Sequence, residues 1–266
     1  MSIQIVSVLL LTFLINFITT LSYSVRIVGI RTGRIAVSFA LFNILVLVSR
    51  TANGFQAPLL ASTIEKNIHA GAGENTFEFR MIILSCTIAT VIGGLLIPTF
   101  QRILSIAVEK FSVYKSVPKI ILLSFSKGGL SSIKENIVFP SPNNITNINI
   151  HKDFPWKVFI MNVFATAIIT IGVLSSLYAG YINPDFRTTA SSLSAVINGF
   201  STILMFMFID PYLSMMTDEV VFGKVKESLF RQYILYMIIA RVVGTILAQF
   251  MLIPAAKILA WVAAMI

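Results

Sequence analysis

The residues of this 266-residue sequence with the clearest chemical potential are arginines inside apolar stretches. Arg241 interrupts an otherwise uncharged run over residues 232–252, and Arg50 is the only charged residue between positions 35 and 64. A charged side chain at the centre of a membrane helix costs about 2.5–3.5 kcal/mol on insertion scales, so it normally faces protein or water. A guanidinium group binds phosphate or carboxylate oxygens in pairs. These arginines therefore favour a site that holds an anion.

Two interpretations of Arg241 stay open at this stage. In the first, Arg241 is structural and is bonded to backbone carbonyls or to an acid at the end of a span, such as Asp210. In the second, it contacts an anion in a hydrated cavity, because ionisable residues inside membrane segments are commonly functional. For Arg50 the alternatives are an anion contact and a marker for the end of a span. Helical spacing places Asn43, Arg50 and Asn53 near one face, which predicts a polar stripe.

A second group of basic residues follows the first apolar run. Arg26, Arg31 and Arg34 lie close together, with Gly29 and Gly33 among them. Juxtamembrane arginines set the topology of a membrane protein, which is the simpler interpretation of this cluster. Glycines also let a phosphate approach the backbone closely, so the same cluster is a candidate anion contact.

The rest of the sequence excludes several kinds of chemistry. It has no nucleotide-binding P-loop and no HExxH motif, its two histidines (His69 and His151) fall in expected loops, and its single cysteine is Cys86. The four aspartates lie at span ends or in loops, so paired intramembrane carboxylates are missing. We therefore expect no catalytic residues, no metal site and no cofactor. Guanidinium and amide groups without acids or imidazoles fit holding an anion better than breaking a bond.

Composition identifies the elements that must position these side chains. Hydrophobic residues make up 56% of the chain, charged residues 12%, and the mean hydropathy is +0.88. A water-soluble domain has about a quarter of its residues charged, so this chain is expected to be an all-α, polytopic membrane protein. A single membrane domain over residues 1–266 is predicted, with six spans near 3–25, 35–50, 81–101, 158–182, 188–209 and 232–252. The second span either ends at Arg50 or continues as a helix broken near Gly54 and Pro58.

The distribution of basic residues predicts the orientation. With six spans, 14 of the 20 lysines and arginines fall on one side, in the loop 26–34, the segment 102–157 and the loop 224–231. The positive-inside rule places that side in the cytoplasm and both termini outside it. Segment 102–157 is then a basic linker at the inner membrane surface. We attribute the net charge of +9 to basic residues that set the topology and contact anionic lipid headgroups, so nucleic acid is not an expected partner.

Two sequence runs resemble a known family. They are Leu-Ser-Tyr-Ser-Val-Arg-Ile-Val-Gly-Ile-Arg-Thr-Gly at 21–33, and a second run with Leu-Phe-Asn at 41–43, Ser-Arg-Thr-Ala-Asn at 49–53 and Pro58. Both resemble the start of the Amj family, bacterial lipid II flippases that serve as alternates to MurJ. The close match covers about 40 residues, while the length, the six spans and the long linker fit along the whole chain.

The resemblance implies a function without an enzymatic step. It implies transport of lipid II, the undecaprenyl-diphosphate-linked peptidoglycan precursor, from the inner to the outer leaflet of the bacterial cytoplasmic membrane, and thereby a role in cell wall biogenesis and cell shape. The matching positions are Arg26, Arg31, Asn43, Arg50 and Asn53. Their contact with the diphosphate or headgroup is our hypothesis.

Arg34 and Arg241 complete the candidate site, as basic groups at the inner surface and near mid-depth. With Arg26, Arg31 and Arg50 they would form a ladder of guanidinium groups along the transport path. Six helices leave little room for a large headgroup, so a homodimer is a candidate assembly. The alternatives are a transporter or channel for a small anion and, less favoured, a polyprenyl-diphosphate phosphatase.

Overall fold

The computed structural model describes residues 2–71, 75–116, 119–120, 123, 126–140 and 154–266. Its regular elements in these ranges are all helices, and six of them are long and apolar enough to cross a membrane. The six are α1 (Ile3–Thr32), α2 (Ile35–His69), α3 (Thr76–Leu95), α8 (Trp156–Ile182), the composite helix over Pro184–Val221, and α12 (Glu227–Met265). The all-α membrane fold with six spanning helices is thus confirmed.

A tight corner joins α1 to α2. Gly33 ends α1 with φ +66°, and the N–H of Arg34 donates to the Gly29 carbonyl at 3.0 Å, which is the left-handed glycine cap of a helix C-terminus. A Cβ on Gly29 would lie 2.8 Å from the Ile35 Cα, so the first turn of α2 packs directly on this glycine. Gly29 therefore serves the close packing of the corner, and its surface is not open to a phosphate.

Helix α2 does not stop at Arg50 but continues to His69, with Pro58 inside it. Proline lacks the N–H that would bond the carbonyl four residues earlier, and its ring crowds that carbonyl. The residue four positions before Pro58 is Gly54. Because the helix runs on, Arg50 lies near the middle of α2 rather than at its end.

The fifth spanning helix is assembled from several pieces. After the 3-10 turn η1 (Pro184–Phe186) come α9 (Arg187–Ser192), α10 (Ser194–Leu204), the π-helical turn η2 (Met205–Ile209) and α11 (Asp210–Val221). Helices α9 and α10 pack against α8, whereas α11 contacts α1 and α12. The π-turn therefore separates a part of this helix that packs on α8 from a part that contacts α1.

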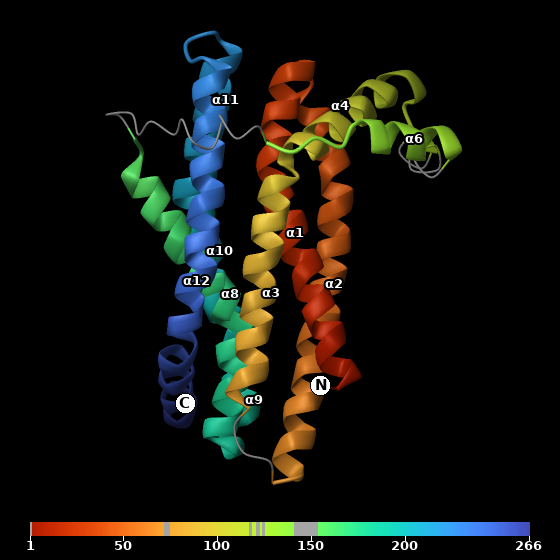
Figure 1. The fold of residues 1–266 in the computed structure, drawn as a ribbon. Coiled ribbons are helices and arrows are strands. Elements are labelled where there is room, and N and C mark those ends of the chain that lie inside the picture. The colour runs from red at the N-terminus through yellow and green to blue at the C-terminus, as the bar shows by residue number, and fades with distance from the viewer. Residues whose placement is uncertain (1, 72–74, 117–118, 121–122, 124–125, 141–153) are drawn as a thin grey trace.

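The expected span over residues 81–101 is divided between two helices. Helix α3 ends at Leu95, and α4 (Ile97–Tyr114) begins after Leu96 with Pro98 in its first turn. Because Pro98 has no N–H to bond the Gly94 carbonyl, the chain can turn here with little loss of helical hydrogen bonding. In Figure 1, α4 runs sideways from the upper end of α3, and α6 (Lys127–Glu135) lies beyond it.

Glycines bring the helices close together. A Cβ on Gly244 of α12 would lie 2.6 Å from the Val163 carbonyl oxygen of α8, and one on Gly93 of α3 would lie 3.0 Å from the Thr20 Cβ of α1. Small residues allow such approach in a membrane, where packing rather than water exclusion holds helices together. By contrast, a Cβ on Gly199 of α10 would meet nothing within 4 Å, and that glycine is exposed.

Both termini lie at one end of the bundle. Figure 1 shows them at the lower end, with α4, α6 and the turn between α11 and α12 at the upper end. The upper end corresponds to the basic segments expected in the cytoplasm. Residues 141–153 of the 102–157 linker lie outside the described residues.

We predict that the end with α4 and α6 faces the cytoplasm. Single cysteines replace Ser2 and Lys224 in a Cys86→Ser background, since Cys86 is the one native thiol and is buried. In intact cells an impermeant thiol reagent should label Ser2→Cys, and it should label Lys224→Cys only after permeabilisation. The opposite pattern would reverse the orientation.

Candidate functional site

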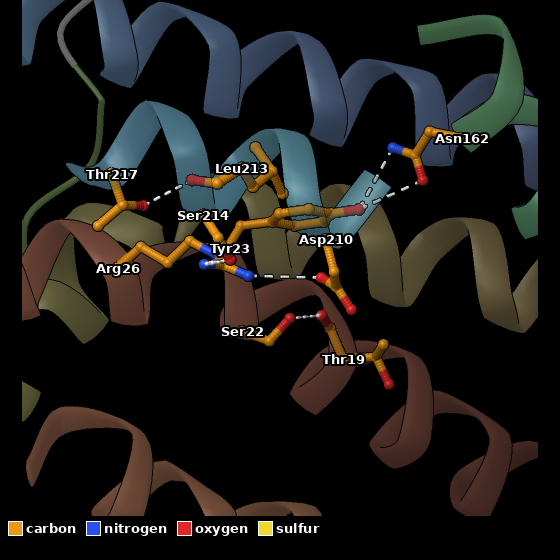
Figure 2. Close-up of polar contacts among 9 residues, drawn as sticks. All are labelled: Thr19, Ser22, Tyr23, Arg26, Asn162, Asp210, Leu213, Ser214 and Thr217. Atoms are coloured by element: carbon orange, nitrogen blue, oxygen red, sulfur yellow. Dashed lines mark hydrogen bonds and ion pairs between the residues drawn. The ribbon is translucent and has the colours of Figure 1, made fainter. Parts of the chain in front are cut away.

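Arg26 is held in a partly buried cluster at the upper end of the bundle (Figure 2). Its guanidinium forms an ion pair with Asp210 at 3.4 Å and donates a hydrogen bond to the Ser214 hydroxyl at 2.9 Å. The side chain is 14% exposed, that of Asp210 40%, and the guanidinium carbon lies 5.3 Å from the centre of the Phe39 ring. Three helices, α1, α2 and α11, therefore surround one positive charge.

The acid in this cluster is positioned by the broken fifth helix. Asp210 is the first residue of α11, directly after the π-turn, and Pro211 follows it in the first turn. The π-turn sets the rotation of α11, and this rotation directs the Asp210 carboxylate to Arg26. One interpretation of the sequence was that Asp210 partners Arg241. The structure pairs Asp210 with Arg26 instead.

Arg31, five residues further along α1, joins this helix to two others. Its Nε donates to Glu227 Oε1 at 2.8 Å, its Nη2 lies 2.7 Å from the same oxygen, and its Nη1 donates to the Gln101 Oε1 at 3.5 Å. Glu227 opens α12 and Gln101 lies in α4. Arg31 is 38% exposed, so this charge remains in contact with the surroundings of the bundle. Arg34 is exposed beyond the end of α1.

The predicted polar stripe exists on α2, but it faces outward. Asn43, Arg50 and Asn53 are all exposed, and none has a side-chain hydrogen bond or ion pair to another described residue. Gln56, one turn beyond Asn53, instead points inward and donates to the Thr12 hydroxyl of α1 at 2.7 Å. The stripe is therefore a polar surface near mid-helix on an otherwise apolar exterior.

Arg241 lies inside the bundle rather than on an open surface. It is 4% exposed, and its buried Nε has no hydrogen-bond partner among the described residues. The thiol of Cys86 on α3 is within electrostatic reach, and the Asn16 amide of α1 donates to that sulfur at 3.2 Å. A positive charge thus lies among α1, α3 and α12 without an acid in the described part of the chain to balance it.

The seven predicted residues therefore occupy three places. Arg26, Arg31 and Arg34 gather at the upper end, Asn43, Arg50 and Asn53 lie on the outer face of α2, and Arg241 is enclosed. Sequence reasoning missed the partners Glu227 and Gln101. Glu227 and Gln101 each lie in the first turns of a helix that begins at the basic side, and this position could have indicated them as partners of the arginines.

The comparisons with known proteins cover nearly the whole chain. The model of the family described as "Amj: Alternate to MurJ" matches residues 11–263. The chain belongs to the Amj family. A relative from Bacillus subtilis (strain 168), named lipid II flippase Amj, is 36% identical over 262 residues, which are 97% of this chain and 96% of the relative. No solved structure matches the chain significantly.

Membership in the Amj family confirms the resemblance drawn from residues 21–58. The match also extends across α8, α11 and α12, so the acids Asp210 and Glu227 that pair with the α1 arginines fall inside the region shared with the family. Within the described residues, no group of three or more His, Cys, Asp or Glu side chains is arranged to hold a metal ion.

We predict that Arg26 and Asp210 are energetically coupled. The free energies of unfolding in mild detergent are measured for Arg26→Gln, Asp210→Asn and the double variant. A contacting charged pair should give a coupling of about 0.5–3 kcal/mol.

The matched control for this coupling combines Arg31→Gln with Asp210→Asn. Arg31 bonds Glu227 and Gln101, so its effect should add to that of Asp210→Asn without coupling. Additive effects for Arg26 and Asp210 as well would contradict the ion pair.

Proposed function

We propose that this chain is a lipid II flippase of the bacterial cytoplasmic membrane. It moves the undecaprenyl-diphosphate-linked peptidoglycan precursor from the inner to the outer leaflet and so supports cell wall biogenesis. The observation that carries the proposal is the 36% identity to a lipid II flippase over 97% of this chain. The chain acts as a transporter and makes or breaks no covalent bond.

The physical task of such a protein is to replace water around a diphosphate. An unpaired anion is strongly disfavoured in hydrocarbon, and guanidinium groups compensate it through short, charge-assisted hydrogen bonds. Arg26 and Arg31 meet this need at the proposed cytoplasmic end, where each now bonds a carboxylate. An arriving diphosphate can exchange with Asp210 or Glu227, because phosphate oxygens present the same acceptors to the guanidinium fork.

Arg241 and Arg50 supply positive charge further along the path. Arg241 is buried without an acid partner in the described chain, so an anion that reaches it provides the compensation that the resting bundle lacks. Because Arg241 is enclosed, the bundle has to open before the substrate reaches it. Arg50 lies on the exposed stripe of α2 with Asn43 and Asn53.

The proposal includes a homodimer. An arginine exposed to lipid tails near mid-helix is costly, so the stripe with Arg50 needs a polar partner that the single bundle leaves open. A second copy can enclose the stripe and widen the space for the headgroup. The fifth spanning helix, which is the least buried of the six, also has an apolar face available for such an interface.

The first test is rescue of a bacterial strain depleted of its resident lipid II flippase. Expression of this chain should prevent lysis and restore lipid II at the outer surface, measured by its accessibility to an external probe. A phosphate-release assay on the purified protein should remain at background. Lysis despite confirmed membrane insertion would reject the flippase and leave the small-anion transporter, whereas phosphate release would favour the phosphatase.

The second test concerns Arg241. Arg241→Leu removes a charge that has no acid partner in the described residues, so it should insert and fold at least as well as wild type but transport lipid II poorly. Arg241→Lys keeps the charge but loses the planar fork, and it should also transport poorly. The measurement is lipid II translocation at matched membrane levels.

The control for Arg241 lies on the same helix. Lys257→Leu removes an exposed charge near the other end of α12 and should leave transport close to wild type. Wild-type transport by Arg241→Leu would reduce Arg241 to a packing residue.

A further inference from the structure

A groove opens on the side of the bundle between α3, the first turns of α4, and α12. Its volume is about 680 Å³. None of the seven site residues expected from the sequence lines it. Its walls and its end differ in chemistry, and that difference identifies what it can hold.

The walls of the groove are apolar and partly open to the outside. Ile234, Ile238 and Val242 repeat along one face of α12, opposite Val91 and Leu95 of α3. Val91 and Leu95 are each 41% exposed, and Val243 at the edge is 42% exposed. In a membrane these open edges face lipid tails, so an apolar chain can enter the groove from the side.

Gly94 keeps the floor of the groove low. A Cβ there would lie 2.9 Å from the Ile238 Cγ2, which leaves no room for a side chain. The glycine therefore brings α3 and α12 together beneath the groove, while the flanking side chains form its walls.

One end of the groove is polar and positively charged. It is lined by Gln101 of α4 and by Ser228, Arg231 and Gln232 in the first turns of α12. Arg231 is exposed and has no ion pair with another described residue. The neighbouring Arg31 bonds the Gln101 amide oxygen, so a second guanidinium borders the same end.

The length of the groove fits a lipid that stands upright in one leaflet. The lining residues of α12 run from Ser228 to Val243, which corresponds to about 22 Å at 1.5 Å per residue. The hydrocarbon core is about 30 Å thick, so the groove reaches past the middle of the bilayer. The charged end lies at the basic end of the bundle, where a headgroup would sit.

We propose that this groove is the entry site for the polyprenyl diphosphate part of the substrate. The diphosphate binds Arg231 with Ser228, Gln232 and Gln101, and the start of the prenyl chain lies against α3 and α12. This inference rests on the proposed flippase function and adds the place where the lipid binds. A diphosphate carries more charge than a phosphodiester headgroup, so it gains more from the guanidinium of Arg231, which has no ion pair with another described residue.

Binding of undecaprenyl diphosphate tests the site without requiring transport. The purified full chain is placed in nanodiscs of zwitterionic lipid, and retention of the labelled lipid is measured. Arg231→Gln should weaken binding about tenfold, the scale of a lost charged hydrogen bond. Val243→Trp and Leu95→Trp fill the groove from opposite walls and should weaken it by a similar factor or more.

Matched controls lie outside the groove. Lys224→Gln removes a nearby exposed charge, and Ile258→Trp adds the same bulk at a 61% exposed position on α12. Both should bind as wild type, and a tenfold excess of phosphatidylglycerol should not displace the diphosphate lipid.

Three results would overturn the proposal. The first is displacement by phosphatidylglycerol, which would make the groove an ordinary phospholipid site. The second is equal binding by the groove variants and the control variants, and the third is wild-type transport by both tryptophan variants. The last result would leave the flippase function standing without the groove. Failure of the wild-type chain to rescue flippase-depleted cells would reject the function, whereas the binding comparison would still report on the site.

Discussion

The cost of a positive charge in hydrocarbon is the constraint on which the rest of this structure depends. Two of the arginines on α1 meet it through carboxylates that come from far along the chain: Arg26 through Asp210 of α11 and Arg31 through Glu227 of α12. These bonds tie the first helix to the last two elements. Helix α1 also contacts α2, α3 and α4, so these ion pairs connect two further elements to a helix that already packs on three others.

Helix α12 combines two opposite environments within a few turns. Arg241 lies among buried residues, and Gly244 beside it packs on the backbone of α8. Ile238 and Val242, by contrast, form the wall of a groove that opens to the side. A helix that is fixed on one face and open on the other can hold a lipid and stay attached to the bundle. The same helix thus links the proposed entry site to the enclosed arginine.

Hydropathy was sufficient to predict the all-α fold and the number of spanning helices, because a helix crosses the hydrocarbon core with about 20 predominantly apolar residues. It could not predict where the segments turn or which faces meet. The corner at Leu96 depends on Pro98, and the continuation of α2 past Pro58 depends on packing against α1, which no local pattern reports.

The arginines of the candidate site could be chosen by residue type alone. Their partners could not, because the position of Asp210 beside Arg26 follows from the rotation of α11. From the sequence, Arg231 is only a topology marker. Polar residues precede an apolar face of the same helix, namely Ser228, Arg231 and Gln232, and this pattern is typical of a site that binds an amphiphilic molecule.

The π-turn at Met205–Ile209 affects where the fifth spanning helix can gain or lose a residue. A π-turn accommodates one residue more than an α-helical turn, and each residue of an α-helix advances the side chains by about 100°. Deleting a single residue within this turn would restore a regular α-helix and leave the faces on both sides nearly unchanged, because the π-turn had absorbed the extra residue. Deleting a residue in the α-helical part of α10 would instead rotate everything beyond it by about 100°, and the Asp210 carboxylate would point away from Arg26. The ion pair therefore tolerates the loss of one residue in the π-turn far better than the loss of one residue in α10.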